Sequence, residues 1–243
     1  LAGAVAAETD AAGADAAGPE VDPRAEEAGL PVVGIDMDEA LADLTARLTA
    51  GERIRELPEP RTLNGTLRPY QIRGLSWLAF LERYGLGACL ADDMGLGKTV
   101  QVIALLLRAK EEGTLDAPTL LVCPTSVVGN WQREAARFTP QLSIHVHHGA
   151  ERSRGEAFTT AVRAADLVIT TYALAARDAA ALRKITWRRV IVDEAQAIKN
   201  AATKQATAIR SIPASTRIAV TGTPVENRLA DLWSILEFAN PGM

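Results

Sequence analysis

The sequence predicts an α/β domain of three layers, in which helices cover both faces of a central, mostly parallel sheet. From residue 70 onward, short apolar runs of strand length alternate with stretches of helical periodicity. Several of these runs are continuously aliphatic, as expected for strands that are covered on both faces. Strands that alternate with helices are joined by right-handed crossovers, which makes neighbouring strands parallel.

The expected elements follow one another in a regular order. We expect strands over residues 87–91, 119–123, 142–146, 166–170, 189–192 and 217–221. Helices are expected over residues 98–110, 127–137 and 202–210, where the pattern between the strands is helical. Prolines at positions 58, 60 and 69 indicate a connector into this domain, which is therefore expected to cover residues 62–243.

The residues before this domain have a different composition. Residues 1–35 are rich in alanine, glycine and acidic side chains, so they cannot bury enough surface to offset the entropy of ordering. We expect them to form a disordered linker. Residues 36–61 are expected to form one short helix and a connector, because four apolar residues fall at helical spacing: Ala40, Leu41, Leu44 and Leu48. The chain begins at Leu1 rather than Met, so we interpret this helix as the end of an upstream domain in a longer protein.

The net charge of −4 is unevenly distributed along the chain. Residues 1–60 carry 14 acidic and 4 basic side chains, a net charge of −10, whereas residues 61–243 carry 16 acidic and 22 basic ones, a net charge of +6. The main domain is therefore mildly basic, which permits a nucleic-acid partner without requiring one.

No apolar run approaches the roughly 18 residues that a membrane span requires, and the start of the chain lacks the pattern of a secretory signal. We therefore expect a cytoplasmic protein without a membrane partner.

The cysteines and histidines do not predict a metal site. Cys89 and Cys123 lie in apolar surroundings without metal-ligand spacing, so both are expected to be buried core residues. His145, His147 and His148 have no carboxylate or cysteine at a supporting spacing, and we interpret them as an exposed strand end.

A glycine-rich segment follows the first predicted strand and opens the first predicted helix. Its sequence over residues 92–99 is Asp-Asp-Met-Gly-Leu-Gly-Lys-Thr, the context that a phosphate-binding loop requires. Lys98 would reach the β and γ phosphates, and the Thr99 hydroxyl would bind Mg²⁺. One departure from the strict pattern is Asp92, which stands where a glycine is usual. The residues expected to bind the nucleotide in this segment are Asp93, Met94, Gly95, Leu96, Gly97, Lys98, Thr99 and Val100.

A pair of carboxylates ends the strand predicted over residues 189–192. Ligands of a parallel sheet bind outside the carboxyl ends of its strands, which is where Asp193 and Glu194 stand. Asp193 would hold Mg²⁺, and Glu194 would orient and deprotonate the attacking water, so these two and Lys98 are the expected catalytic residues. An ordinary acidic helix cap is the alternative, and the phosphate loop earlier in the chain makes it less favoured.

These two segments resemble motifs I and II of the SWI/SNF-type branch of superfamily-two helicase-like ATPases, in which an acidic residue replaces the first glycine. Four further segments resemble motifs of that family in the right order: residues 67–71 its adenine-reading segment, 121–126 motif Ia, 169–172 motif Ib, and 221–224 with Asn227 motif III. The resemblance covers roughly residues 62–243 and is strongest with bacterial members. It implies a RecA-like P-loop NTPase lobe that uses ATP and Mg²⁺ and moves on double-stranded DNA.

The resemblance also implies roles for single residues. Gln71 would contact the adenine base. Phosphates of the nucleic-acid backbone would be bound, without reading of the base sequence, by Thr125, Ser126, Asn130, Thr170 and Thr171. The nucleotide state would be relayed to the nucleic-acid face by Thr221, Gly222 and Thr223. Trp77 and Trp131 are expected to be packing residues.

In this family, ATP hydrolysis needs a second RecA-like lobe that supplies arginines across the cleft. The residues after motif III are too few to form that lobe, so we expect this chain alone to bind ATP weakly and hydrolyse it very slowly. The full protein is expected on the bacterial nucleoid when it is bound to DNA.

Two alternatives remain open. One is an RNA- or DNA-unwinding superfamily-two helicase, whose motif I would lack Asp92. The other is a non-catalytic nucleotide-binding interaction module, which would predict decay at Lys98, Asp193 or Glu194, and all three are intact.

Overall fold

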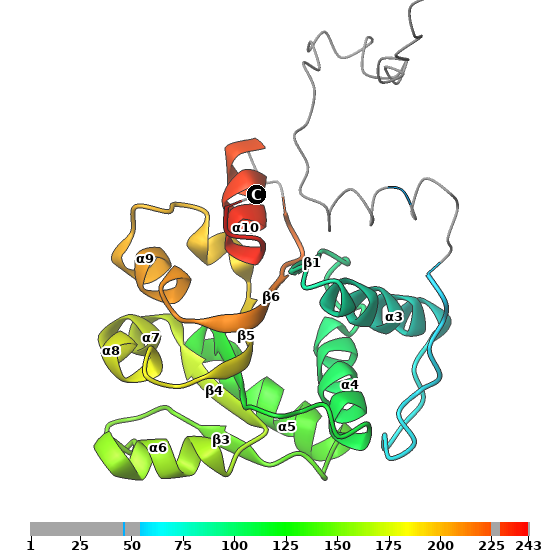
Figure 1. The fold of residues 1–243 in the computed structure, drawn as a ribbon, viewed down its shortest axis with the longest axis horizontal. Coiled ribbons are helices and arrows are strands. Elements are labelled where there is room, and N and C mark those ends of the chain that lie inside the picture. Colours follow the sequence, from blue (N-terminus) through cyan, green and yellow to red (C-terminus); the bar gives the residue numbers. More distant parts are fainter. Residues whose placement is uncertain (1–45, 47–53, 225–228, 243) are drawn as a thin grey trace, which may run out of the picture. The chain divides into compact units, whose positions relative to one another are not determined.

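The computed structural model describes residue 46, residues 54–224 and residues 229–242 (Figure 1). The fold belongs to the unit of residues 51–243. Its centre is one six-stranded sheet with the order β1-β6-β5-β2-β4-β3, in which every neighbouring pair is parallel. The strands are β1 (Ala88–Leu90), β2 (Thr119–Cys123), β3 (Ile144–Val146), β4 (Leu167–Thr171), β5 (Trp187–Asp193) and β6 (Ala214–Val220). The predicted parallel sheet is confirmed.

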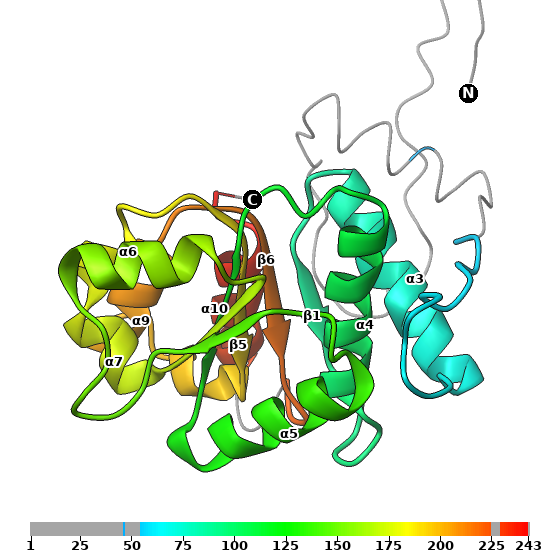
Figure 2. The same cartoon turned by 90° about the horizontal axis from the view of Figure 1, so that it is seen from below.

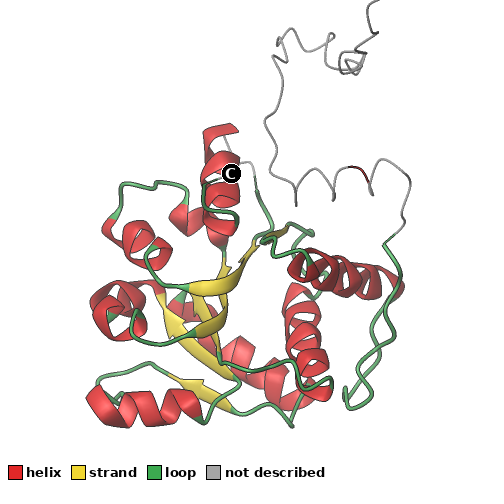
Figure 3. Cartoon of the chain, viewed as in Figure 1, coloured by secondary structure: helices red, strands yellow, loops and turns green. Residues whose placement is uncertain are grey.

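Helices cover both faces of the sheet, which gives the expected three layers (Figures 1 and 3). One face is covered by α3 (Pro69–Arg83), α4 (Lys98–Glu111), the short 3₁₀ helix η1 (Thr125–Val127) and α5 (Val128–Phe138). The other face is covered by α6 (Gly155–Arg163), α7 (Tyr172–Arg177), α8 (Ala179–Leu182), η2 (Ala195–Ile198), α9 (Lys204–Arg210) and α10 (Leu229–Ala239). Figure 2 shows α3 and α4 on one side of the sheet and α6, α7 and α9 on the other.

The two apolar cores follow from the alternation of side chains along each strand. In β2, Leu121 packs into the core under α3, α4 and α5, whereas Leu120 and Val122 pack into the core under α6 to α10. In β5, Ile191 packs into the first of these cores and Val190 into the second. A strand that is buried on both faces needs a continuous aliphatic run, and the sequence shows this pattern.

Several elements differ from the sequence-based expectation. The strand expected over residues 217–221 ends at Val220 and begins three residues earlier, and the one expected over 189–192 begins at Trp187. Helices α3, α6, α7, α8 and α10 were not among the expected helices, and at the start of α3 a proline had indicated a connector. The proline occupies the first helical position, where its missing N–H costs nothing. The predicted linker over residues 1–35, most of the helix after it, and Asn227 lie outside the described residues.

Two expectations about single residues are corrected. His147 is only 2% exposed, so it is not part of an exposed strand end; its Nε2 lies 2.9 Å from the Asp178 carboxylate, which a buried polar ring requires. Cys89 is half-buried, whereas Cys123 is fully buried, and burial raises the pKa of the Cys123 thiol to about 12. Within the described residues, no cluster of three potential metal ligands occurs and no helix is long and apolar enough to cross a membrane.

The register of the sheet aligns the carboxyl ends of its strands. Leu90 at the end of β1 pairs with Val220 at the end of β6, and Val220 pairs in turn with Asp193 at the end of β5. Cys123 at the end of β2 pairs with Thr171 at the end of β4. The loops that follow these strands therefore leave the sheet at one edge, where α/β folds bind their ligands.

Helices α3 and α4 approach closely at Gly74. The side chain of Gln101 on α4 is fully buried there, and its Nε2 donates a 2.7 Å hydrogen bond to Asp92 Oδ2. A Cβ atom at position 74 would lie 1.8 Å from Gln101 Oε1. Glycine at position 74 therefore leaves room for the glutamine that holds Asp92 at the start of the phosphate loop.

A buried ion pair ties α3 to the beginning of β5. Arg189 is 2% exposed, and its Nη2 donates to Glu82 Oε2 at 2.8 Å. Arg188 donates to the other oxygen of the same carboxylate. Burial lowers the pKa of Arg189, and the charge of Glu82 opposes this effect. Glu82 therefore compensates a guanidinium that would otherwise be buried without a counter-charge.

We expect Gly74→Ala to destabilise the domain by about 1–3 kcal/mol, because Gln101 must move out of a filled core. Gly129→Ala is a matched control inside α5, where the nearest atom is the flexible end of Arg133 at 3.3 Å. This change is expected to stabilise the domain by up to about 1 kcal/mol, the usual difference between alanine and glycine in a helix. Urea unfolding of both variants measures the difference, and equal effects would contradict the proposed contact.

Glu82→Ala is expected to cost about 3–5 kcal/mol of unfolding free energy, because Arg189 would remain buried without its partner. The control is Glu237→Ala. The Glu237 side chain pairs with Arg210 and is 46% exposed, so a loss of at most about 1 kcal/mol of unfolding free energy is expected. Chemical denaturation followed by circular dichroism compares the two. A Glu82→Ala variant as stable as Glu237→Ala would show that the buried pair is not needed.

Candidate nucleotide-binding site

The predicted phosphate loop connects β1 to α4 in the structure. Gly95 and Gly97 have φ angles of +84° and +74°, a left-handed conformation that favours glycine. Gly97 is also the residue before the first turn of α4, and a Cβ there would lie 2.6 Å from Gln71 Nε2. The backbone N–H groups of the first turn of a helix have no partner within the helix and suit an anion. Backbone conformation thus accounts for both glycines, and close packing against Gln71 is a second reason at Gly97.

Lys98 lies across this loop. Its Nζ donates to the carbonyl oxygens of Asp92 at 2.6 Å and Asp93 at 3.0 Å, so the ammonium group is held inside the curve of the loop. Gly222, in the segment after β6, closes the other side: a Cβ there would lie 2.8 Å from Met94 Cγ and 3.9 Å from Lys98 Nζ. The structure therefore brings the predicted coupling residue Gly222 against the phosphate loop.

Gln71 also contacts the loop. Its Nε2 donates to the carbonyl oxygen of Leu96 at 3.1 Å, and its Oε1 accepts the backbone N–H of Arg68, which closes the first turn of α3. An open cavity of about 530 Å³ lies beside the same turn and is lined by Tyr70, Arg73, Gly74, Trp77, Cys89, Leu90, Ala91 and Asp92. Trp77 is half-buried and packs against the core, as expected. The volume is within the usual range for a small-molecule site.

Asp193 ends β5 with both carboxylate oxygens engaged. Oδ2 accepts the indole N–H of Trp131 at 2.7 Å, and Oδ1 accepts the backbone N–H of Glu194 at 2.9 Å. Burial raises the pKa of the Asp193 carboxyl, and these two donors oppose that effect. A carboxylate has about four acceptor positions, so two remain for other partners.

Glu194 stands in a strained backbone conformation. Its φ and ψ are 53° and 56°, and among the described residues it is the only non-glycine with a positive φ. Such a conformation costs on the order of 1–3 kcal/mol and persists only where the surroundings impose it. Here the hydroxyl of Tyr172 donates to the carbonyl oxygens of Asp193 at 2.7 Å and Glu194 at 3.3 Å. Tyr172 thus helps to fix the turn that carries both carboxylates.

A chain of hydrogen bonds connects Glu194 to the segment after β6. Gln196 Nε2 donates to Glu194 Oε2 at 2.7 Å, and Gln196 Oε1 accepts from Thr221 Oγ1 at 2.9 Å. Thr221 Oγ1 in turn accepts the backbone N–H of Thr223 at 3.1 Å. The expected catalytic carboxylate and two of the three expected coupling residues therefore belong to one network.

Sequence reasoning missed the contributions of Trp131, Tyr172, Gln101 and Gln196. Trp131 was expected only to pack, and no role was expected for Gln196. Trp131, Tyr172 and Gln196 each bond a residue more than 20 positions away, which no local spacing signals. The bond from Gln101 to Asp92 spans nine positions and depends on how α4 packs beside the loop.

The residues expected to contact nucleic acid fall into two groups. Thr125 and Ser126 are exposed in η1, and Asn130 is half-buried with its Nδ2 bonded to Glu134 at 2.8 Å. Thr170 and Thr171 are buried instead. The Thr170 hydroxyl donates to the His147 carbonyl, and the Thr171 hydroxyl accepts from the Leu174 N–H at the start of α7. Only the first group presents polar atoms at the surface.

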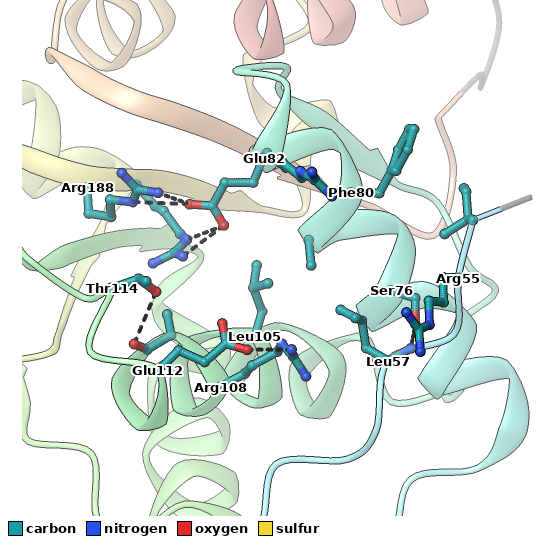
Figure 4. A pocket seen from close by; sticks show the side chains of 15 residues that line it. Arg55, Leu57, Ser76, Phe80, Glu82, Leu105, Arg108, Glu112, Thr114 and Arg188 are labelled. Carbon is teal, nitrogen blue, oxygen red and sulfur yellow. Dashed lines mark hydrogen bonds and ion pairs between the residues drawn. The ribbon is translucent and has the colours of Figure 1, made fainter. Parts of the chain in front are cut away.

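A cavity of about 510 Å³ lies at the opposite edge of the sheet, between the ends of α3 and α4 and the beginning of β5 (Figure 4). Five arginines line it, and Figure 4 shows Glu82 beside Arg188. Arg83 and Arg108 stand in the last turns of their helices, where a cation complements the helix dipole. Arg188 and Arg189 are paired with Glu82. None of the residues that line this cavity belongs to the phosphate loop, so the cavity is not part of the nucleotide site.

Several known proteins are similar to this chain. The solved Sulfolobus solfataricus SWI2/SNF2 ATPase core in complex with dsDNA has a TM-score of 0.70 and 45% sequence identity, over 77% of this chain and 38% of that chain. YwqA of Bacillus subtilis, which is named as an ATP-dependent helicase/translocase, is 49% identical over 210 residues, 86% of this chain and 23% of YwqA. The human chromatin-remodeling ATPase INO80 is 33% identical over 216 residues, 86% of this chain and 14% of INO80.

The chain therefore spans less than a quarter of the length of these two relatives. A sequence model of the SNF2-related domain matches residues 70–243, which is most of the chain. The phosphate loop, the carboxylates of β5 and the network after β6 all lie within that match, and the chain belongs to the SNF2-related domain family.

Proposed function

We propose that this chain is the ATP-binding lobe of a DNA-dependent ATPase that couples ATP hydrolysis to movement on duplex DNA. The observation that carries the proposal is the convergence of three segments at one sheet edge: the phosphate loop, the Asp193–Glu194 turn, and the Thr221–Thr223 segment bonded to it. In this proposal the phosphate loop binds the nucleotide, and the Asp193–Glu194 turn activates water. The Thr221–Thr223 segment relays the nucleotide state to a second ligand.

The residues present fit ATP and Mg²⁺. Gly95 and Gly97 have the backbone conformation that turns N–H groups toward phosphate, and Lys98 already lies within that loop. Thr99 in the first turn of α4 and Asp193 supply oxygen atoms of the kind that Mg²⁺ prefers. When bound, Mg²⁺ supplies positive charge that offsets the charge of the phosphates. Gln71 is proposed to contact the adenine base, because an open cavity lies beside the helical turn that carries it.

Glu194 is proposed to orient the attacking water and accept its proton. The strained turn and the hydrogen bond from Gln196 hold its side chain in one orientation. Because Gln196 also accepts from Thr221, a change at Glu194 would be transmitted to residues 221–223. Such a relay is what a motor needs to connect nucleotide state to movement.

Duplex DNA is the proposed second ligand, bound through its backbone. The exposed hydroxyls of Thr125 and Ser126 can bond phosphates without reading bases, and Asn130 follows in the next turn. The main domain is mildly basic, and the similar Sulfolobus core is solved with dsDNA. Thr170 and Thr171 are proposed to act indirectly, by holding the backbone at the end of β4.

We further propose that residues 62–243 are one lobe of a two-lobe motor. The second lobe would supply arginines to the nucleotide, so this chain alone should hydrolyse ATP very slowly. We also propose that the full protein lies on the bacterial nucleoid while it is bound to DNA.

Lys98→Ala is expected to weaken ATP binding at least about tenfold, because it removes the charge-assisted contact to phosphate. Glu194→Gln should retain ATP binding and lose the residual hydrolysis, since it removes only the base. Lys184→Ala, at an exposed lysine after α8, is the matched control. A fluorescent ATP analogue measures binding and phosphate release measures hydrolysis. Turnover at the rate of intact family motors would contradict the need for a second lobe.

Ser126→Glu is expected to weaken duplex DNA binding to a similar extent for all sequences, because a carboxylate would face the phosphates. Ser215→Glu places the same charge at an exposed position near the beginning of β6, at the opposite edge of the sheet, and should have little effect. Fluorescence anisotropy at several salt concentrations measures both. Binding of RNA alone would favour an RNA-unwinding enzyme, and nucleotide binding without any hydrolysis or DNA binding would favour an interaction module.

A further inference from the structure

Trp131 makes an unusual contact for a packing residue. The residue is 1% exposed on the buried side of α5, and its indole N–H donates to Asp193 Oδ2 at 2.7 Å. The other carboxylate oxygen is held by the backbone N–H of Glu194. One bond to each oxygen fixes the carboxylate in its plane and leaves an acceptor position on each oxygen.

We infer that Trp131 is a positioning residue: it orients Asp193 for Mg²⁺ and connects the DNA-facing helix α5 to the nucleotide site. The inference rests on the proposed function, which assigns Mg²⁺ to Asp193 and DNA to the start of α5. It adds a direct physical link between the two ligands, separate from the network through Gln196 and Thr221.

The position of Trp131 in α5 supports this connection. The buried residues of the helix are Val128, Trp131 and Ala135, spaced three and four apart, so they form one inward face. The exposed Thr125 and Ser126 belong to η1, which continues directly into α5. A shift of this helical segment when phosphate is bound at its start would move the indole N–H relative to Asp193.

The plainer explanation is that a buried indole needs any acceptor. Trp187 shows that case: it is equally buried, and its Nε1 donates to the carbonyl oxygen of Leu182 at 2.9 Å. Trp131 differs because its acceptor is a carboxylate at the functional edge of the sheet. A hydrogen bond to an ionised acceptor is shorter and stronger than one to a neutral carbonyl, and it fixes the direction of that acceptor.

The test compares Trp131→Phe with Trp187→Phe in this chain. Both changes remove a buried indole N–H and part of a ring, but only the first touches Asp193. Replacement of Trp131 by β-(3-benzothienyl)alanine keeps the bicyclic shape and removes only the donor. The metal probe is Mn²⁺ in the presence of ADP, followed by electron paramagnetic resonance, and urea unfolding reports the stability of each variant.

We expect both Trp131 variants to weaken Mn²⁺ binding by about 10- to 100-fold, the usual effect of removing a residue that orients a metal ligand. Trp187→Phe should leave Mn²⁺ binding unchanged despite a comparable loss of stability. In ¹⁵N spectra of the four indoles, addition of Mg²⁺ with ADP should move the Trp131 signal and not the Trp187 signal. Unchanged Mn²⁺ affinity in both Trp131 variants would overturn the positioning role. Absence of metal-dependent ADP binding by the parent chain would overturn it together with the proposed nucleotide site.

A second arm adds duplex DNA. In the parent chain DNA should change the Mn²⁺ affinity, whereas in the benzothienyl variant this change should disappear while DNA affinity without nucleotide is retained. Persistence of the full DNA effect in that variant would overturn the connection through α5. If the parent chain binds no duplex DNA at all, the proposed DNA motor fails and the connection through α5 fails with it, while the orientation of Asp193 by Trp131 is still decided by the metal measurements.

Discussion

The parallel register of the sheet is the constraint on which the site depends. Because Leu90, Val220 and Asp193 stand in one row across β1, β6 and β5, the loops that follow them leave the sheet at the same level. Neighbouring strands lie about 4.8 Å apart, so side chains from the three loops can reach one another directly. A shift of β5 by one residue would also exchange the faces of its aliphatic side chains between the two cores. Burial of both faces thus fixes the geometry of the functional edge.

Polar and charged groups are partly buried at that edge, and hydrogen bonds hold them in place. Asp193 is half-buried, and burial raises the pKa of its carboxyl group. Two hydrogen-bond donors, Trp131 and the backbone N–H of Glu194, lower that pKa and so favour the charged form. Glu194 adopts a left-handed conformation that costs free energy, and Tyr172 holds the turn. A strained backbone and a buried charge in one place are typical of a functional site, because both destabilise the fold and are retained where function needs them.

The opposite edge of the sheet serves stability. There Glu82 compensates two arginines at the beginning of β5, and basic residues complement the ends of α3 and α4. These same helices begin at the nucleotide site, with Gln71 in α3 and Lys98 as the first residue of α4. The attachment of α3 to β5 through Glu82 at one end therefore supports the position of Gln71 at the other.

The sequence by itself determined the fold class, the order of strands along the chain, the phosphate loop and the pair of carboxylates. These features are local: continuous aliphatic runs, glycines before a helix, and acidic residues at the end of a strand each follow from residues adjacent in the chain. Helix α3 was missed because a proline and a glycine weaken its local pattern, whereas its stability comes from packing on α4 through Gly74.

Only the tertiary structure decided which side chains meet. The bond from Trp131 to Asp193 joins residues 62 positions apart, and the burial of Thr170 and Thr171 depends on the elements that pack around β4. Such contacts depend on strand order and helix packing, which no short-range spacing encodes. The residues that could bind nucleotide or metal were therefore predictable from the sequence. The contacts that orient and connect these residues depend on the tertiary structure.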